Sequence, residues 1–264
     1  MNERSSDKYT NNFQGLIQLI HTLLGPTGCI WDKDQTRESL IPMLLEETCE
    51  LIDGINNQDI DNTKEEIGDV LFHMAFQICI SISTSSFNEY DVFKYVIEKY
   101  IRRHPHVFGN TNISNKEEIL SNWEEIKKEE SQNKTSYLDG IPISLPALSY
   151  AKKIQDKASK VGFDWEQVSE IKDKIIEEFE ELAAANNPTH QEEEMGDIIF
   201  TIVNAARHMG IDAENALRKS NNKFELRFKY MENIATEKGL DFKNITLLEK
   251  DRLWDEVKLK NNIL

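Results

Sequence analysis

Two groups of acidic residues have the spacing of a metal site. Residues three or four positions apart share one face of an α-helix, with Cβ atoms about 5–6 Å apart, so paired carboxylates at this spacing project together. Each half of the chain contains two such pairs, and two facing pairs would form a four-carboxylate cup. The first cup consists of Glu47, Glu50, Glu66 and Asp69, and the second cup of Glu178, Glu181, Glu194 and Asp197.

A cup of this kind favours a divalent cation. Like charges about 4 Å apart repel by about 4 kcal/mol at an effective dielectric of 20, so partly buried carboxylates either raise their pKa values or bind a cation. Oxygen ligands without Cys or His select Mg²⁺, and Mn²⁺ is possible. Because Mg²⁺ keeps several waters and takes substrate phosphates, the pattern predicts a metal-chelated polyphosphate as the natural ligand.

The two cups belong to a duplicated segment. LLEETCELIDGI from Leu44 is echoed by IIEEFEELAAA from Ile175, and EEIGDVLFHMAF from Glu65 by EEMGDIIFTIVN from Glu193. The gap between the two acidic motifs suits a helix end, a short loop and the start of an antiparallel helix. The repeated pattern therefore predicts a duplication with one helical hairpin in each copy.

An acidic helix face is often plain solvated surface, and that alternative stays open for a single copy. Two features favour a site: EEIGD and EEMGD carry no Lys or Arg, and each contains a glycine, Gly68 or Gly196. A glycine inside a helix costs about 1 kcal/mol relative to alanine, so we expect packing or a close approach at both positions. His73 follows Asp69 by four residues and is either a core histidine or a metal contact.

Several other kinds of site are excluded by pattern. A di-iron carboxylate bundle needs Glu-x-x-His on two helices, and no glutamate here has a histidine three residues later. The sequence also lacks a GxxxxGK[ST] phosphate loop and a GxSxG nucleophile motif. The three cysteines form no CxxC pair, which fits a reducing compartment.

Apolar residues at helical spacing predict an all-α fold, because no segment alternates as β-strands do. The turn-rich segment 131–148 holds two of the six prolines and should not be helical. We predict an N-terminal domain at 1–132, a linker at 133–146 and a C-terminal domain at 147–264. The predicted helices are 13–24, 39–55, 62–83, 88–103, 116–131, 146–161, 167–185, 190–209, 212–237 and 247–259.

Composition limits the partners. The 264 residues carry a formal charge of −16, which a phosphate backbone would repel, so we expect no nucleic-acid partner. The N-terminus lacks an apolar signal core, and the apolar run from Val70 covers about 13 residues against the about 20 needed to cross a bilayer. We therefore expect a cytoplasmic protein without a membrane partner.

The pattern EExxE followed by ExxD resembles the all-α nucleoside triphosphate pyrophosphohydrolases, and its two-copy form is similar to the MazG family. Five further segments carry the resemblance: GCIWDKDQT from Gly28, RRHPHVFG from Arg102, IPISLPAL from Ile141, KIQDKASKVGFDW from Lys153 and NKFELRF from Asn222. The resemblance implies two tandem MazG-like helical bundles, a homodimer, and Mg²⁺-dependent hydrolysis of NTPs and dNTPs to monophosphate and pyrophosphate. A role in cleaning the nucleotide pool or in stress-related nucleotide turnover would follow.

The resemblance also implies roles for single residues. It makes the second cup the metal site of the main catalytic copy, with Glu177 and Glu193 beside it as catalytic residues. We expect one of these two to take a proton from the attacking water. The residues implied to bind the substrate are Lys174, Lys223 and Arg227 at the phosphates and Trp254 at the nucleotide.

The first cup matches the same acidic motif, so it is a second candidate metal site. Arg102 and Arg103 stand at about the right distance from Asp69 to replace the basic residues of the second copy, although Pro105 interrupts the helix there. His190 stands where the family pattern has a lysine, which predicts weaker and pH-sensitive phosphate binding. The alternative function is a non-catalytic, nucleotide-sensing or protein-interaction helical dimer, and the first copy could serve dimerisation alone.

Overall fold

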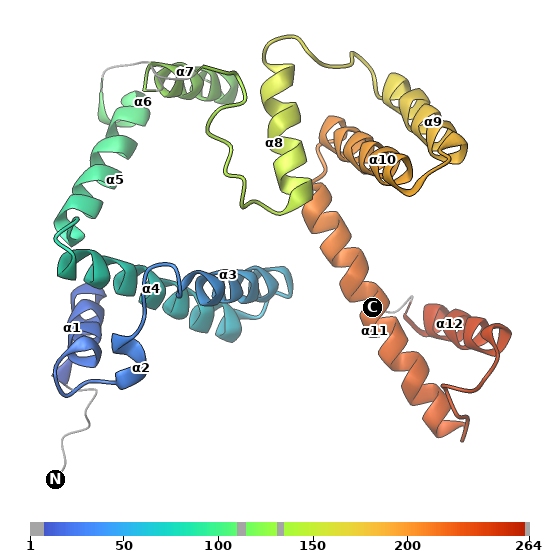
Figure 1. Ribbon diagram of the computed structural model, residues 1–264, viewed down its shortest axis with the longest axis horizontal. Helices are drawn as coiled ribbons and strands as arrows, with labels where there is room; N and C mark the ends of the chain where they lie inside the picture. The colour runs from blue at the N-terminus through green and yellow to red at the C-terminus, as the bar shows by residue number, and fades with distance from the viewer. Residues whose placement is uncertain (1–7, 110–114, 131–134, 262–264) are drawn as a thin grey trace. The chain divides into compact units, whose positions relative to one another are not determined.

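The computed structural model describes residues 8–109, 115–130 and 135–261, and every regular element in these ranges is a helix. The predicted all-α fold class is therefore confirmed. The helices in chain order are α1 (Phe13–Leu24), α2 (Ile30–Lys33), α3 (Ile41–Asn56), α4 (Ile60–Ser83), α5 (Glu89–Arg103), α6 (Pro105–Phe108), α7 (Lys116–Glu129), α8 (Ala147–Ser159), α9 (Val168–Ala184), α10 (Pro188–His208), α11 (Ala213–Glu237) and α12 (Leu247–Asn261) (Figure 1).

The ten predicted helices are present, with ends within two residues of the prediction. Small shifts follow from capping side chains. Helix α10 begins at Pro188, before the predicted start, because the Asn187 side chain accepts a hydrogen bond from the His190 amide at 3.0 Å. The two helices that periodicity missed, α2 and α6, contain four residues each, too few for an apolar period to register.

The chain divides into two compact units, residues 1–130 and 131–264. Residues 135–146 form turns and no helix, as the prolines predicted. The predicted limit between residues 132 and 133 lies outside the described residues, so the proposed division into two domains and a linker stays a prediction.

In the first unit, α4 is the central helix. It packs against α3 on one side and against α1 on another (Figure 1). The core between α1 and α4 contains Ile17, Ile20, Phe76 and Cys79, each at most 2% exposed. Gln58, with φ at 56°, closes the short turn between α3 and α4. This hairpin sets the two halves of the first cup side by side.

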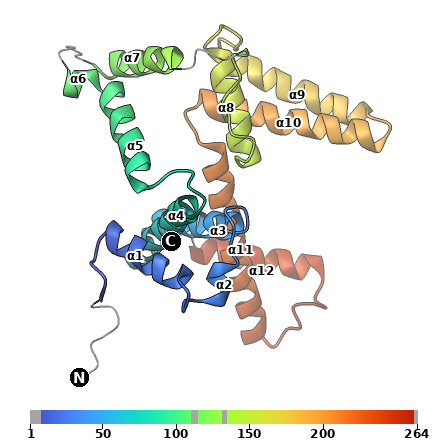
Figure 2. The same ribbon diagram turned by 60° about the vertical axis from the view of Figure 1, so that its left-hand side comes forward.

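In the second unit, α9 and α10 form the matching hairpin, and α8 packs against α10 (Figure 1). A separate core joins α11 to α12 through Met231, Ile234, Ala235, Leu253 and Val257. Helices α11 and α12 lie side by side in both views (Figure 2). The second cup lies on the hairpin of α9 and α10, as the repeat predicted.

Helix α4 is the one described helix that is long and apolar enough to cross a membrane by length and composition alone. Its 24 residues exceed the apolar run seen in the sequence because the helix begins ten residues before Val70. Phe76, Ala75 and Cys79 of this helix are fully buried in the core of the first unit. Buried core helices commonly pass the same test, so α4 is weak support for a membrane segment.

Candidate metal centre

The α9–α10 hairpin brings three of the four second-cup residues together. One carboxylate oxygen each of Glu178, Glu194 and Asp197 lies within 4.8 Å of the other two. Glu178 on α9 and Glu194 on α10 are buried, at 5% and 9% exposed, whereas Asp197 is open to solvent. A group that combines buried carboxylates with an exposed one can hold a cation and leave one side for a second ligand.

The α3–α4 hairpin gathers the matching residues Glu47, Glu66 and Asp69 to the same limit of 4.8 Å. Glu66 is 6% exposed, and its Oε2 atom is buried without a hydrogen-bond partner among the described residues. Burial, the hydrogen bond with Glu47 and the nearby charges of Glu50, Glu47 and Asp69 raise the pKa of Glu66 to about 7. Without a cation, this group is electrostatically strained.

The fourth glutamate of each cup lies outside these groups of three. Glu50 and Glu181 offer no oxygen within the same 4.8 Å limit. Glu181 nevertheless interacts electrostatically with the group of three. Burial raises the Glu181 pKa, the charge of Lys174 opposes the rise, and the charges of Glu194 and Glu178 add to it. The hairpin geometry thus supports a cluster of three carboxylates in each copy, with Glu50 and Glu181 nearby.

The basic residues beside the second cup are held by its carboxylates. The Lys174 ammonium lies 2.9 Å from both Glu177 and Glu178, and these hydrogen bonds raise the Lys174 pKa. The His190 Nε2 atom lies 2.8 Å from Glu194 Oε1, so this departure from the family pattern contacts the cluster directly. Glu193 is exposed on α10, one residue from the cluster.

The remaining predicted substrate residues lie on α11 and α12. The Arg227 guanidinium lies 5.8 Å from the centre of the Trp254 ring, and Phe224 packs on the same ring at 5.3 Å. Lys223 is exposed one turn before Arg227. In residues 135–261, no hydrogen bond or ion pair joins Lys223, Arg227 or Trp254 to the second cup, so their predicted role stays a prediction.

The candidate basic residues of the first copy have another partner. Arg102 and Arg103 at the end of α5 both bind the carboxylate of Glu130, and the Arg102 Nη2 to Glu130 Oε1 distance is 2.5 Å. These bonds, led by that from Arg103, lower the Glu130 pKa to about 2. The structure therefore shows these arginines in a tertiary contact with Glu130 and not at the first cup.

The expected packing at the two cup glycines is not found among the described residues of the chain. Gly68 and Gly196 were expected to permit packing or a close approach, yet a Cβ atom at either position would meet nothing within 4 Å. Both glycines are exposed on the outer face of their helices. Within the described part of one chain, no neighbour explains the cost of a glycine inside these helices.

The variant Gly196→Ala tests this point. Because the position is open, alanine is expected to stabilise the isolated chain by about 1 kcal/mol through helix propensity. Urea denaturation of the variant and of the parent protein at equal concentration measures the difference. A loss of stability, or a shift in the association constant, would show that another surface approaches Gly196 in solution.

The donor sets fit a hard divalent cation. Each cluster presents three carboxylates, and in the first one a buried Glu66 oxygen has no hydrogen-bond partner in the described part of the chain. Carboxylate oxygens at this spacing are the ligands that Mg²⁺ and Mn²⁺ accept. The assignment of these residues as metal ligands stays a prediction, which the geometry supports.

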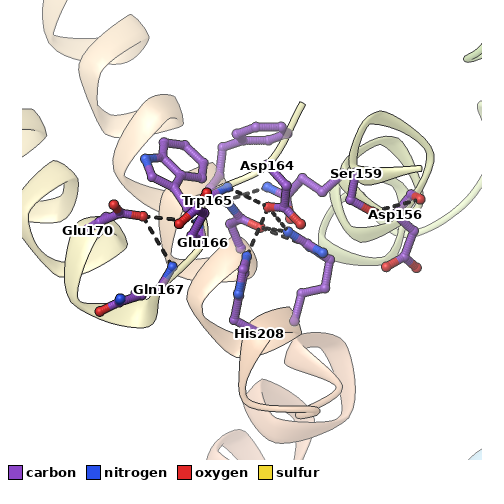
Figure 3. Close-up of polar contacts among 12 residues, drawn as sticks. Asp156, Ser159, Asp164, Trp165, Glu166, Gln167, Glu170 and His208 are labelled. Carbon is purple, nitrogen blue, oxygen red and sulfur yellow. Dashed lines mark hydrogen bonds and ion pairs between the residues drawn. The ribbon is translucent and has the colours of Figure 1, made fainter. Parts of the chain in front are cut away.

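A polar cluster that pattern reasoning missed fixes the loop before α9. Asp164 accepts hydrogen bonds from Arg207 at 2.5 Å and His208 at 2.9 Å, both at the end of α10. Figure 3 shows the Asp164 and His208 side chains facing each other. Glu170 then accepts hydrogen bonds from the Glu166 and Gln167 amides, at 3.0 and 3.1 Å, and caps α9. The signal available in the sequence was the VGFDW segment, whose partners only the fold reveals.

Replacing Asp164 should loosen this anchor in a pH-dependent manner. Burial opposes its ionisation, but the bonds from Arg207 and His208 lower the Asp164 pKa below its ordinary value. The stability that Asp164 contributes is thus present above the unfolded-state pKa of about 4 and is lost as pH falls through the lower folded-state pKa. Asp164→Asn is expected to cost about 1–3 kcal/mol at pH 7, because Arg207 loses its charged partner.

Thermal unfolding of Asp164→Asn and the parent protein from pH 7 to pH 2 checks this expectation. The Asp251→Asn variant, at an exposed position on α12, serves as a charge-matched control. A Tm difference between Asp164→Asn and the parent that persists unchanged at the lowest pH would contradict an ionic anchor.

Comparison with known proteins gives the family. The model of the MazG nucleotide pyrophosphohydrolase domain matches residues 35–108 and 166–231, which contain the first and second cups respectively. The nucleoside triphosphate pyrophosphohydrolase of Escherichia coli K12 is 40% identical over 256 residues, covering 94% of this chain and 97% of that protein. The nucleoside triphosphate pyrophosphohydrolase/pyrophosphatase MazG of Thermotoga maritima is 42% identical over 248 residues, covering 93% of this chain and 95% of that protein.

Two further matches are partial. The uncharacterized protein YabN of Bacillus subtilis is 42% identical over 94% of this chain, which spans 52% of that protein. A crystal structure of a MazG-related protein from Thermotoga maritima covers 44% of this chain and 98% of its own length, with 28% identity and a TM-score of 0.39. The two domain matches and the near full-length relatives show that the chain belongs to the MazG family of nucleotide pyrophosphohydrolases.

Proposed function

We propose that this protein hydrolyses NTPs and dNTPs to the nucleoside monophosphate and pyrophosphate in a Mg²⁺-dependent reaction. Water attacks the α-phosphorus, the bond from this atom to the α–β bridging oxygen breaks, and pyrophosphate leaves. The cluster of Glu178, Glu194 and Asp197 is the observation that carries the proposal, because three carboxylates within 4.8 Å suit a cation that also takes phosphate oxygens. The near full-length relatives named for this activity support the same reaction.

In this proposal the second cup holds the metal of the main catalytic copy. A divalent cation bound there would neutralise phosphate charge and acidify a bound water. Glu178, Glu194 and Asp197 supply ligand oxygens, and Glu181 stands nearby as a further ligand. The first cup, built on Glu47, Glu66, Asp69 and the nearby Glu50, holds a second divalent cation.

The other residues of the second copy act on substrate and protons. Glu177 is half exposed, with 56% of its side chain accessible, and lies 2.9 Å from Lys174. A substrate phosphate can therefore compete with Glu177 for Lys174, and a proton can compete with Lys174 for Glu177. Glu193, exposed beside the cluster, is the second candidate for the base that takes the water proton. Lys174, Lys223 and Arg227 bind phosphates, and Trp254 offers its ring to the nucleotide.

The experiment that tests the proposal is ³¹P NMR of the products formed from ATP and from dUTP, with Mg²⁺ and with a chelator. Monophosphate and pyrophosphate formed only with metal are the expected products. Orthophosphate and diphosphate would indicate a different phosphohydrolase. No reaction with any nucleotide would favour a nucleotide-sensing or protein-interaction role.

We also propose that the protein is a cytoplasmic homodimer whose stress-related role is nucleotide turnover. Apolar side chains on the cup-bearing helices support self-association, because they remain 38–83% exposed in the single chain. On the first hairpin these residues are Ile41, Leu45, Ile52, Ile55, Ile60, Ile67 and Leu71. Sedimentation velocity of the parent protein and of Leu45→Lys measures the association, and a parent protein that sediments as a monomer would contradict it.

A further inference from the structure

The two cups differ at one position that the duplication makes directly comparable. Four residues after the aspartate of each copy, the first has His73 and the second has Thr201. His73 continues the helical face of Glu66 and Asp69, because residues three or four positions apart on a helix lie on one side. The first cup therefore has a buried nitrogen donor on the helix that carries Glu66 and Asp69. The second has a hydroxyl at the matching position, and its own histidine, His190, is exposed and lies 2.8 Å from Glu194.

The surroundings of His73 do not resemble those of a satisfied core histidine. The residue is 7% exposed, and its Nδ1 atom is buried with no hydrogen-bond partner among the described residues. Its Nε2 atom faces Glu47 Oε1 at 4.0 Å, which is beyond hydrogen-bond distance. A buried imidazole with neither nitrogen hydrogen-bonded lacks the partners that such groups nearly always have.

The distance from Nε2 to Glu47 suits a shared cation. Metal–nitrogen and metal–carboxylate bonds of about 2.0–2.2 Å allow two ligand atoms on one ion to lie up to about 4.2 Å apart. Glu66, also buried, contributes an oxygen without a partner to the same cluster. Two neighbouring buried side chains thus carry unpartnered polar atoms. Oε2 of Glu66 belongs to a residue of the three-carboxylate group, whereas His73 lies outside the 4.8 Å limit of that group, with Nδ1 unpartnered and Nε2 facing Glu47.

The first cup also has less compensating positive charge than the second. In the second copy, Lys174 lies 2.9 Å from Glu178 and compensates part of the negative charge. The matching position in the first copy is Met43, so no lysine performs that task. The first cup depends more strongly on a bound cation for neutralisation.

We infer that the first cup is a mixed nitrogen and oxygen site in which His73 joins Glu47, Glu66 and Asp69, and that it binds a transition-metal dication in preference to Mg²⁺. Imidazole suits Co²⁺, Ni²⁺ and Zn²⁺, whereas Mg²⁺ prefers oxygen ligands alone. The second cup, which lacks the buried histidine, keeps the preference for Mg²⁺. The inference rests on the proposed metal site of the first copy and is independent of turnover by the second.

The test uses the full-length protein with the second cup disabled by Asp197→Asn. Isothermal titration with CoCl₂ and separately with MgCl₂ measures the affinity of the first cup in this parent. We expect one equivalent of Co²⁺ to bind more tightly than Mg²⁺. His73→Thr, which copies the residue of the second cup, and His73→Gln are then made in the same parent.

Both variants are expected to weaken Co²⁺ binding at least about tenfold, since the loss of even a supporting contact costs 10–100-fold. Mg²⁺ affinity should change by less than about twofold in the same proteins, because carboxylates alone bind Mg²⁺. Unchanged Co²⁺ affinity in either folded variant, or equal losses for both metals, would overturn the inference. Mg²⁺ binding as tightly as Co²⁺ to the parent would overturn it as well.

A direct readout covers the case in which neither variant folds. Histidine ring ¹⁵N resonances of the Asp197→Asn protein are recorded with and without ZnCl₂, and the signals of the other five histidines, His21, His104, His106, His190 and His208, are identified from single His→Gln variants. A Zn²⁺-dependent shift of the one remaining ring signal, at one equivalent of metal, supports ligation by His73. Absence of such a shift at saturating Zn²⁺ overturns it, whatever the outcome of the nucleotide hydrolysis experiment.

Discussion

Asp197→Asn is expected to lower kcat for nucleoside triphosphate hydrolysis about a thousandfold. A bound metal stabilises transition-state charge by several kcal/mol, and each 1.36 kcal/mol corresponds to a factor of ten. Asparagine keeps the shape of the side chain but removes the charged ligand from the group of Glu178, Glu194 and Asp197. Because Asp197 is exposed, the fold should be unaffected. Pyrophosphate release assays at saturating Mg²⁺ measure the change.

Two control variants locate the effect. Glu192→Gln removes one negative charge from an exposed position on the same helix, α10, and should leave kcat within about twofold, since exposed charges away from a site contribute little. Asp69→Asn makes the same change at the matching position of the first copy and should cost far less than Asp197→Asn. Full activity in Asp197→Asn would refute the second cup as the catalytic metal site.

Glu66→Gln is expected to stabilise the metal-free protein at pH 8, raising Tm by several degrees. In the folded protein the pKa of Glu66 is about 7, above its ordinary value of 4.5, chiefly because the carboxyl is buried. A raised pKa means that folding favours the protonated form. Its favourable contribution is complete below pH 4.5 and is lost as pH rises through about 7. Glutamine cannot ionise, so it escapes this loss.

Differential scanning calorimetry in chelator from pH 4.5 to pH 8 checks this sign. The Tm values of Glu66→Gln and the parent should converge at pH 4.5 and diverge toward pH 8. Glu65→Gln, the same change at the exposed neighbouring residue, should lack this pH-dependent gain. A Tm difference of equal size at every pH would mean that ionisation of Glu66 is not its cause.

Metal addition at pH 8 should give the parent protein a higher Tm than Glu66→Gln, the reverse of their order in chelator. A divalent ion that binds only the folded state stabilises it by about 2.7 kcal/mol at a hundred times its dissociation constant. The parent protein should gain this at pH 8, whereas Glu66→Gln, with a ligand replaced, should gain markedly less. An equal rise in Tm for both proteins would place the ion elsewhere.

The longer helices and the repeat can be read from the amino-acid sequence. Apolar periodicity and caps are local properties, so the ten longer helices could be placed to within two residues. The duplicated EExxE and ExxD motifs likewise predicted two hairpins with facing carboxylates, because helical spacing fixes which residues share a face. Short helices such as α2, at Ile30–Lys33, lie below the length at which a period is visible.

Helix packing determines which residues meet and how deeply they are buried. Spacing treated Glu47 and Glu50 as equivalent, but hairpin packing brings Glu47 and not Glu50 into the group of three. The contacts of Asp164 with Arg207, and of Arg103 with Glu130, join residues too distant in sequence for any local pattern.

His73 illustrates the physical reason. In the sequence it could be a core residue or a metal contact, since both choices place it on the same face of α4. Its burial and the 4.0 Å from Nε2 to Glu47 depend on how α3 packs on α4, which helical periodicity cannot specify. Local propensity fixes the helices, whereas desolvation and ligand geometry arise only where two helices meet.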